Sequence, residues 1–222
     1  MKKIVLMGIL IGGVVFNGTA QSKGSLGQND PKAKTVLDGV SKKFKTLKTV
    51  VANFVLKVEG ANNSVSDSKK GTVYLKGSKY KVTMEGQEMI SDNKTSWTYA
   101  KDVNEVTINN VDQNSGALTP AKLFTNFYDK DFLYRLEGES TEKGKVLQNI
   151  EMTPTDKSKN IFKVLVSVDK KNQNISKMKV FEKNGNHYTY EITNFSPNAK
   201  VDDATFTFDA KKYPGVEVVD LR

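Results

Sequence analysis

The feature of this 222-residue sequence that most constrains its fold is a repeated two-residue alternation of apolar and polar side chains. It is clear in residues 52–58, and similar short runs recur along most of the chain. Successive side chains of a β-strand point to opposite faces, so this period indicates strands with one apolar face. Sequences that favour hairpin turns separate the runs, among them Gly77-Ser78, Asp92-Asn93-Lys94 and Asn184-Gly185-Asn186. We therefore expect a large antiparallel meander.

The alternating runs predict ten or eleven strands. We assign them to residues 50–58, 72–76, 80–84, 89–91, 96–99, 105–111, 132–137, 145–153, 161–169, 175–182 and 187–195. Residues 60–71 are polar, and we interpret them as a turn. A sheet with this many regularly spaced strands is expected to curl towards a barrel.

Two segments carry a helical period instead. Asp30-Pro31 supplies an N-cap and a proline at the first helical position, and apolar residues then recur every three or four positions from Ala33 to Leu47. Lysines occupy the opposite side, which gives this helix a basic outer face. A second helix is predicted to start at Thr119-Pro120. We expect the fold to be mainly β, with the two amphipathic helices closing the concave side of the sheet and leaving a cavity.

The N-terminus has the pattern of a signal peptide in residues 1–20. Lys2-Lys3 precedes an apolar run, and Gly18-Thr19-Ala20 is a small-residue cleavage site. The apolar run is shorter than the ~20 residues that span a bilayer, so we predict export rather than anchoring. The mature chain is expected to begin at Gln21, with residues 21–29 as a flexible leader and 30–222 as a single domain.

Composition excludes several classes of chemistry. The chain has no cysteine and one histidine, His187, so thiol catalysis, disulfides and cysteine metal sites are impossible and a Ser-His-Asp triad would rest on one residue. Asp202-Asp203 could form a carboxylate pair, but acids at a turn are more often caps. No nucleotide-binding, hydrolase or metal motif is found, so we expect no enzyme activity, cofactor or metal.

Basic residues outnumber acidic ones, with 34 Lys+Arg against 25 Asp+Glu, which favours anionic partners. The charges are scattered rather than clustered with stacking aromatic side chains. We therefore expect no nucleic-acid partner.

Apolar residues of the predicted strands and helices are candidates for lining the cavity. A filled β core explains them as well, and the sequence alone does not separate the two interpretations. Met84 suits a ligand-binding wall because a thioether adapts to irregular ligands. The candidates are Val36, Leu37, Val40, Phe54, Leu56, Tyr74, Tyr80, Val82, Met84, Ile90, Trp97, Tyr99, Leu123, Phe124 and Phe127.

Several short stretches, taken in order, resemble a known family. They are most specific in residues 91–99, with the pattern Ser-Asp-x-Lys-Thr-x-Trp-x-Tyr, and in the ending 203–222. Together they resemble the periplasmic outer-membrane lipoprotein carrier family of the LolA type. The resemblance implies an unclosed antiparallel β-barrel whose helical lid covers an apolar cavity for the acyl chains of lipoproteins. It also implies an inner-membrane ABC-type exporter that loads the carrier and an outer-membrane acceptor or bilayer that unloads it.

The sequence departs from this family at one position. Proteobacterial relatives carry an arginine, usually followed by proline, just before the third strand, and there it holds the lid closed through hydrogen bonds. Residues 75–80 contain no arginine, and Lys76 is the nearest cation. Lysine is a point charge rather than a planar fork, so we predict that Lys76 does not replace the arginine as the main latch.

Three other functions are weighed against a lipoprotein carrier. An apolar-ligand or lipoprotein-sensing protein could use the same half-barrel. An outer-membrane barrel also has alternating strands, but the chain ends in Leu221-Arg222 rather than an aromatic residue, and lysines occupy both strand faces. An enzyme is the weakest alternative, because no catalytic motif is present.

Overall fold

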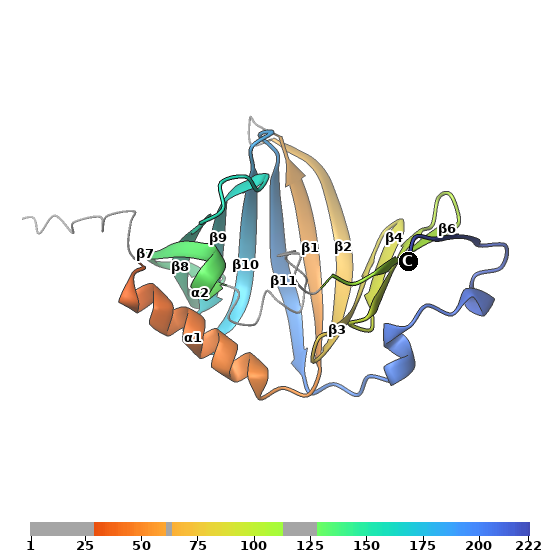
Figure 1. Ribbon diagram of the computed structural model, residues 1–222. Helices are drawn as coiled ribbons and strands as arrows, with labels where there is room; N and C mark the ends of the chain where they lie inside the picture. Colours follow the sequence, from red (N-terminus) through yellow and green to blue (C-terminus); the bar gives the residue numbers. More distant parts are fainter. Residues whose placement is uncertain (1–28, 61–63, 113–127) are drawn as a thin grey trace, which may run out of the picture.

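The computed structural model describes residues 29–60, 64–112 and 128–222. Its helices and strands are α1 (Pro31–Lys45), β1 (Val50–Glu59), β2 (Val65–Lys76), β3 (Lys79–Met84), β4 (Gln87–Ser91), β5 (Thr95–Ala100), β6 (Glu105–Asn110), α2 (Tyr128–Asp131), β7 (Phe132–Glu142), β8 (Lys145–Pro154), β9 (Ile161–Asp169), β10 (Asn174–Glu182), β11 (His187–Pro197) and β12 (Glu217–Asp220), with 3-10 helices η2 (Asp203–Phe206) and η3 (Ala210–Lys212) (Figure 1). The predicted signal peptide and residues 21–28 of the leader lie outside this part of the chain.

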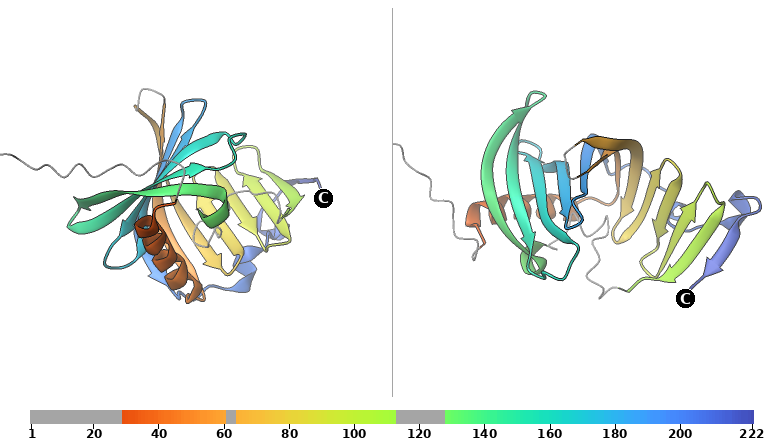
Figure 2. Two further views of the ribbon diagram at one scale, coloured as in Figure 1. Left: turned by 60° about the vertical axis from the view of Figure 1, so that its left-hand side comes forward. Right: turned by 90° about the horizontal axis from the view of Figure 1, so that it is seen from above.

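All twelve strands of the described residues belong to one unclosed sheet in the order β12-β6-β5-β4-β3-β2-β1-β11-β10-β9-β8-β7. Most neighbours are antiparallel hairpin partners, and β1 joins the two halves by pairing with both β2 and β11. The two edge strands, β7 and β12, lie far apart on opposite sides of the twisted sheet (Figure 2). The prediction of a mainly β, unclosed and largely antiparallel fold is confirmed.

Two strand assignments differ from the sequence prediction. Residues 65–71, expected to be part of a turn, form the first half of β2 and pair with β1. Their side chains are mostly exposed, so main-chain pairing forms this part of the strand without an apolar alternation. The second difference is β12, a short strand that was not among the predicted ones. It pairs in parallel with β6, whereas we expected an antiparallel meander throughout.

The first predicted helix is confirmed as α1. The Asp30 carboxylate accepts a hydrogen bond from the Lys32 amide at 2.8 Å, Pro31 occupies the first turn, and Ala33, Leu37 and Val40 are buried. Of the second predicted helix, residues 119–127 lie outside the described residues, and α2 begins at Tyr128.

Both ends of α1 are fastened to the sheet. At the N-terminal end, the Asp30 amide donates to the Tyr134 carbonyl at 3.1 Å and the Asp30 carboxylate accepts from the Leu136 amide at 3.0 Å. Just beyond the C-terminal end, the Lys48 amide donates to the Asn198 side chain at 2.8 Å. The helix therefore spans from edge strand β7 to the segment that leaves β11 (Figure 1).

The apolar side of the sheet changes between its two halves. We call the face packed against α1 the inner face, and on it Leu37 and Val40 meet a core that includes Ile150 and Val166. On β4 to β6 most apolar residues, among them Ile90, Trp97 and Val106, lie on the outer face instead. There a C-terminal cover, residues 202–216, packs its aromatic side chains on the sheet. Two covers thus protect opposite faces in opposite halves of the molecule.

Gly71 allows a close approach on the inner face. It lies opposite Phe54 on β1 and Met84 on β3. A Cβ atom at this position would lie 2.4 Å from Cζ of Phe54 and 2.9 Å from Cγ of Met84. The absence of a side chain therefore lets the Phe54 ring lie across β2.

We expect Gly71→Ala to lower the free energy of unfolding by about 1–3 kcal/mol, because the added methyl overpacks this contact. The control is Gly39→Ala on α1, where the nearest atoms belong to the flexible Gln173 side chain. That change should leave stability unchanged or raise it by about 0.5–1 kcal/mol through helix propensity. Urea unfolding measures both, and a Gly71→Ala protein as stable as wild type would contradict the packing.

Candidate functional site

The inner face of β1, β2, β3 and β11 carries an apolar cluster beside the part of the sheet that α1 covers. Its buried members are Val50, Ala52, Phe54, Leu56, Val73, Leu75 and Val82, and half-buried Val58, Tyr80, Met84, Met89, Tyr188, Tyr190, Ile192 and Phe195 pack against them. We call this set the inner apolar cluster. Phe44 and Leu47, at the end of α1 and just beyond it, also pack against it.

A hollow of about 570 Å³ lies beside Gly71, where β2 has no side chain. Residues of both faces border it: Phe54 and Met84 lie on the inner face, whereas Asn53, Thr72 and Thr83 lie on the outer face. It is therefore an open hollow at the gap left by Gly71 and not an enclosed pocket of the inner apolar cluster.

Five of the predicted cavity residues meet in the inner apolar cluster: Phe54, Leu56, Tyr80, Val82 and Met84. Val36, Leu37 and Val40 lie in the neighbouring core between α1 and β7 to β10. Leu56 thus lies in a different cluster from these three helix residues, and the helix end contacts its cluster through Phe44 on α1 and Leu47 just beyond it.

Four other predicted residues lie on the outer face. Met89 pairs with Val82 on the inner face, so its neighbour Ile90 points outward, and Trp97 lies opposite Ile90. Tyr74 and Tyr99 lie on the same outer face, where the Tyr99 ring is 4.6 Å from the Tyr213 ring. The grouping of Tyr74, Ile90, Trp97 and Tyr99 with the cavity wall is thus corrected.

The two-residue turn Glu85-Gly86 was the available signal for this change of face. It sets Met84 opposite Gln87, and counting onward from that pair puts Ile90 out of phase with the apolar residues of β3. Leu123, Phe124 and Phe127, the remaining predicted residues, lie outside the described residues.

Sequence reasoning missed the contribution of β11. Tyr190 lies opposite Leu56 and Tyr188 opposite Val58, and the Tyr190 ring is 6.1 Å from the Phe54 ring. Burial raises the pKa of the Tyr80 and Tyr190 phenols, so both stay neutral at physiological pH. Nothing in the local sequence shows that β11 is the neighbour of β1.

The polar residues singled out in the sequence have structural contacts. Asp202 caps η2 by accepting from the Ala204 amide at 2.8 Å. Lys76 lies on the outer face and forms a 3.0 Å ion pair with Asp203, so it fastens the C-terminal cover rather than α1. The His187 ring lies 4.5 Å from the Phe181 ring at the start of β11. Within the described residues there is no group of three or more potential metal ligands.

Comparison with known proteins agrees with this architecture. Residues 45–209 match the model of the family described as outer membrane lipoprotein carrier protein LolA. The chain belongs to the LolA family. No curated protein matches it in a sequence search. Among the described residues, no helix has the length and apolar character needed to cross a membrane.

Solved structures are similar to this chain at low sequence identity. An uncharacterized conserved protein from Thermus thermophilus is 14% identical to this chain, with a TM-score of 0.54. The match covers 85% of this chain and 99% of the Thermus protein. A LolA superfamily protein from Nitrosomonas europaea is 14% identical, with a TM-score of 0.42. This match covers 80% of this chain and 98% of the Nitrosomonas protein. LprF from Mycobacterium bovis is 15% identical, with a TM-score of 0.45, and the match covers 79% of this chain and 97% of LprF.

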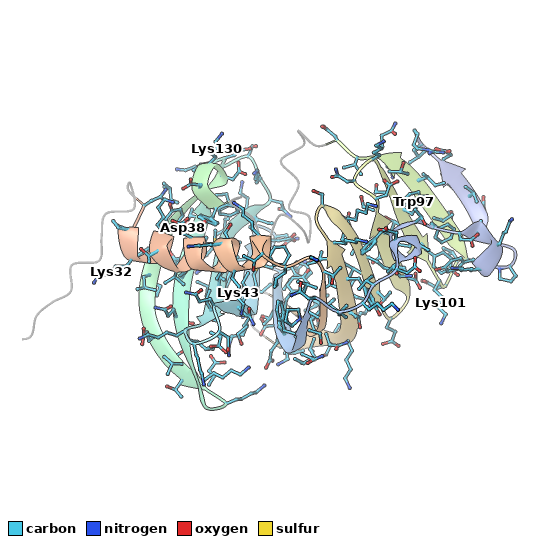
Figure 3. The ribbon with its side chains drawn as sticks, turned by 90° about the horizontal axis from the view of Figure 1, so that it is seen from below. Lys32, Asp38, Lys43, Trp97, Lys101 and Lys130 are labelled. Carbon is cyan, nitrogen blue, oxygen red and sulfur yellow. The ribbon has the colours of Figure 1, made fainter. Side chains whose placement is uncertain are left out.

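A hydrogen bond joins α1 to α2, the two α-helices in the described part of this LolA-family chain. The Tyr128 hydroxyl donates to the Asp38 carboxylate at 2.7 Å, and Lys34 forms a 3.0 Å ion pair with the same carboxylate. In Figure 3, Asp38 lies on the side of α1 that faces α2. The hydrogen bond from Tyr128, together with Lys34, lowers the pKa of Asp38 despite opposing desolvation.

Because the pKa of Asp38 is lower in the folded chain than in the unfolded one, ionised Asp38 stabilises the fold above about pH 4. This contribution is lost as the pH falls through the lower folded value. We expect Tyr128→Phe to reduce the free energy of unfolding at neutral pH by up to about 1 kcal/mol, since the carboxylate is half exposed. The difference from wild type should shrink as acid protonates Asp38. Urea unfolding across this range tests it, and a difference independent of pH would contradict the assignment.

Proposed function

We propose that this protein carries the acyl chains of lipoproteins through the periplasm, from the inner to the outer membrane. The observation that carries the proposal is the inner apolar cluster, which lies on an open sheet in a chain of the LolA family. Its aromatic, aliphatic and thioether side chains suit flexible hydrocarbon. Phe54, Met84 and Tyr190 are the residues we expect to contact the ligand.

The energetics of acyl binding favour an open site. Each buried methylene contributes ~0.8 kcal/mol, so three fully wrapped chains of ~16 carbons would gain over ~30 kcal/mol, beyond the practical limit of about 20 for non-covalent binding. A carrier that released its cargo would need to cover only part of it. Half-buried Met84, Met89 and Tyr190 are consistent with such partial coverage.

The remaining parts of the proposal come from the family. An inner-membrane ABC-type exporter would load the protein, and an outer-membrane acceptor or the bilayer would unload it. Cleavage after Ala20 would release the mature chain into the periplasm. Shielding acyl chains requires no catalytic group, metal or cofactor.

The direct test is native mass spectrometry of the protein purified from the periplasm of its host. We expect an acylated polypeptide to co-purify, and the mass of the protein itself should correspond to a chain beginning at or near Gln21. Copurification of free fatty acid or of another apolar molecule alone would contradict lipoprotein carriage. It would instead favour the apolar-ligand alternative.

A pair of variants tests which face binds the ligand. Met84→Glu places a carboxylate in the inner apolar cluster, and its desolvation should weaken binding of a fluorescent acyl probe about tenfold or more. Tyr74→Glu is the matched control, because Tyr74 is also half buried but lies on the outer face. Thermal unfolding of both variants identifies any general loss of structure. Equal loss of binding in two folded variants would contradict the assignment of the inner face.

Lys76→Ala tests whether Lys76 takes the place of the family's arginine, which holds the lid closed. Because the Lys76 ion pair lies on the outer face, we expect this variant to bind the acyl probe as wild type does. Its unfolding free energy should fall by less than about 1 kcal/mol, as for other exposed ion pairs. A severe binding defect in a folded Lys76→Ala protein would show that this lysine acts on the site.

A further inference from the structure

One end of the sheet carries a concentration of lysine side chains. Three segments meet there: residues 42–48 at the end of α1, the turn 169–173 between β9 and β10, and residues 198–200 after β11. Their lysines are Lys42, Lys43, Lys45, Lys48, Lys170, Lys171 and Lys200. We call this surface the basic pole. Figure 3 views the molecule from this end, with Lys43 labelled on α1.

Hydrogen bonds hold the three segments together as one surface. The Lys43 ammonium group donates to the Asn172 carbonyl, which joins α1 to the β9–β10 turn. The Asn198 amide donates to the Thr49 carbonyl at 2.8 Å, and the Asn198 side chain accepts from the Lys48 amide at 2.8 Å. The lysines are therefore presented by a rigid framework, and their long side chains extend from it.

Most of this charge is not neutralised nearby. Within the described residues, the exposed side chains of Lys42, Lys48, Lys171 and Lys200 form no ion pair with a carboxylate, whereas Lys170 pairs with Glu139 at 2.7 Å. Asp169 is the one acid in the three segments. It is 5% exposed, and its carboxylate accepts hydrogen bonds from the Lys171 and Asn172 amides.

The lysines elsewhere on the sheet provide a contrast. On the outer face of β1 and β10, Lys57, Lys177 and Lys179 each form an ion pair with a glutamate. That face carries mixed and mutually compensating charge. The basic pole instead has an excess of positive charge, which suits an anionic surface.

We propose that the basic pole docks on the surface of a bilayer that contains anionic phospholipids. All of its cations are lysines, and lysine is a hydrated point charge on a flexible stem that can follow phosphates in a fluid layer. Protein interfaces are instead enriched in arginine and depleted in lysine, so an acidic protein is the less suitable partner.

The contact is electrostatic rather than inserted. Phe44 and Leu47, the large apolar residues among these lysines, are half buried and pack against the inner apolar cluster. Binding should therefore be reversible and sensitive to salt, because attraction between exposed charges falls off within about 8–10 Å at physiological ionic strength. This proposal does not depend on acyl carriage.

The test is co-sedimentation of the purified protein with vesicles. We expect binding to an equimolar mixture of phosphatidylglycerol and phosphatidylcholine at low salt, and none to phosphatidylcholine alone. Binding should be lost at about 1 M salt, where the screening length is about 3 Å. The triple variant Lys42→Gln, Lys48→Gln, Lys171→Gln should weaken binding to the anionic vesicles about tenfold or more.

The matched control removes the same charge at the opposite end of the strands, where the β8–β9 and β10–β11 turns lie. It is the triple variant Lys157→Gln, Lys159→Gln, Lys183→Gln, and it should keep most of the binding. Changing the first three lysines to arginine should also preserve binding, because the charge remains. Equal loss in both glutamine triples would overturn the assignment to this end, and absence of any preference for anionic vesicles would overturn membrane docking altogether. The second result would leave an acidic protein as the partner to seek.

Discussion

The pairing of β1 with β11 is the contact on which the rest of the structure depends. Val50–Glu59 runs antiparallel to His187–Pro197, so one ladder joins strands from the two ends of the described chain. Without it the sheet would separate into β1 to β6 with β12 and β7 to β11. The same ladder places Tyr190 opposite Leu56, and the inner apolar cluster therefore exists only once this long-range pairing has formed.

The two covers follow from the same arrangement. The chain enters β1 from α1 and leaves β11 towards η2 at the same end of the sheet, and the two segments then diverge (Figure 1). One crosses the inner face of β7 to β10, and the other crosses the outer face of β3 to β6. On the inner faces of β1 to β3, Phe44 of α1 and Leu47 just beyond it pack against the inner apolar cluster.

The open sheet has two edges, and each is protected differently. On β7, the Asn29 side chain accepts from the Tyr134 amide at 3.1 Å, and Asp30 binds the neighbouring main-chain groups. These contacts satisfy groups that could otherwise pair with another chain. On β12, Glu217 and Asp220 put charge at an edge only four residues long. The residues that start α1 thus serve the helix and the sheet edge together.

Features of the fold that depend on neighbouring residues could be predicted from the sequence. The Asp30-Pro31 start of α1 and the hairpin turns were readable, because caps and turns depend on neighbouring residues. The polar half of β2 was not, since its strand forms by pairing with β1 rather than by its own alternation. The predicted cavity residues lie on two different faces of the sheet for a related reason. Alternation predicts that a strand has an apolar face, but which cover meets that face depends on segments far away in the sequence, as the contact between Tyr99 and Tyr213 shows.

The end of α1 shows how one short sequence can serve two environments. From Lys42 to Lys48, lysines alternate irregularly with Phe44 and Leu47, and the last turn of α1 and the residues just after it turn Phe44 and Leu47 towards the sheet while Lys42 and Lys48 stay exposed. The apolar pair completes the inner apolar cluster, whereas the lysines remain at the basic pole. A substitution that removes charge here need not disturb packing, because exposed lysines contribute little to the core. Conversely, a change at Phe44 would alter both the cluster and the position of the lysines, so charge and packing can be separated experimentally only through the exposed positions.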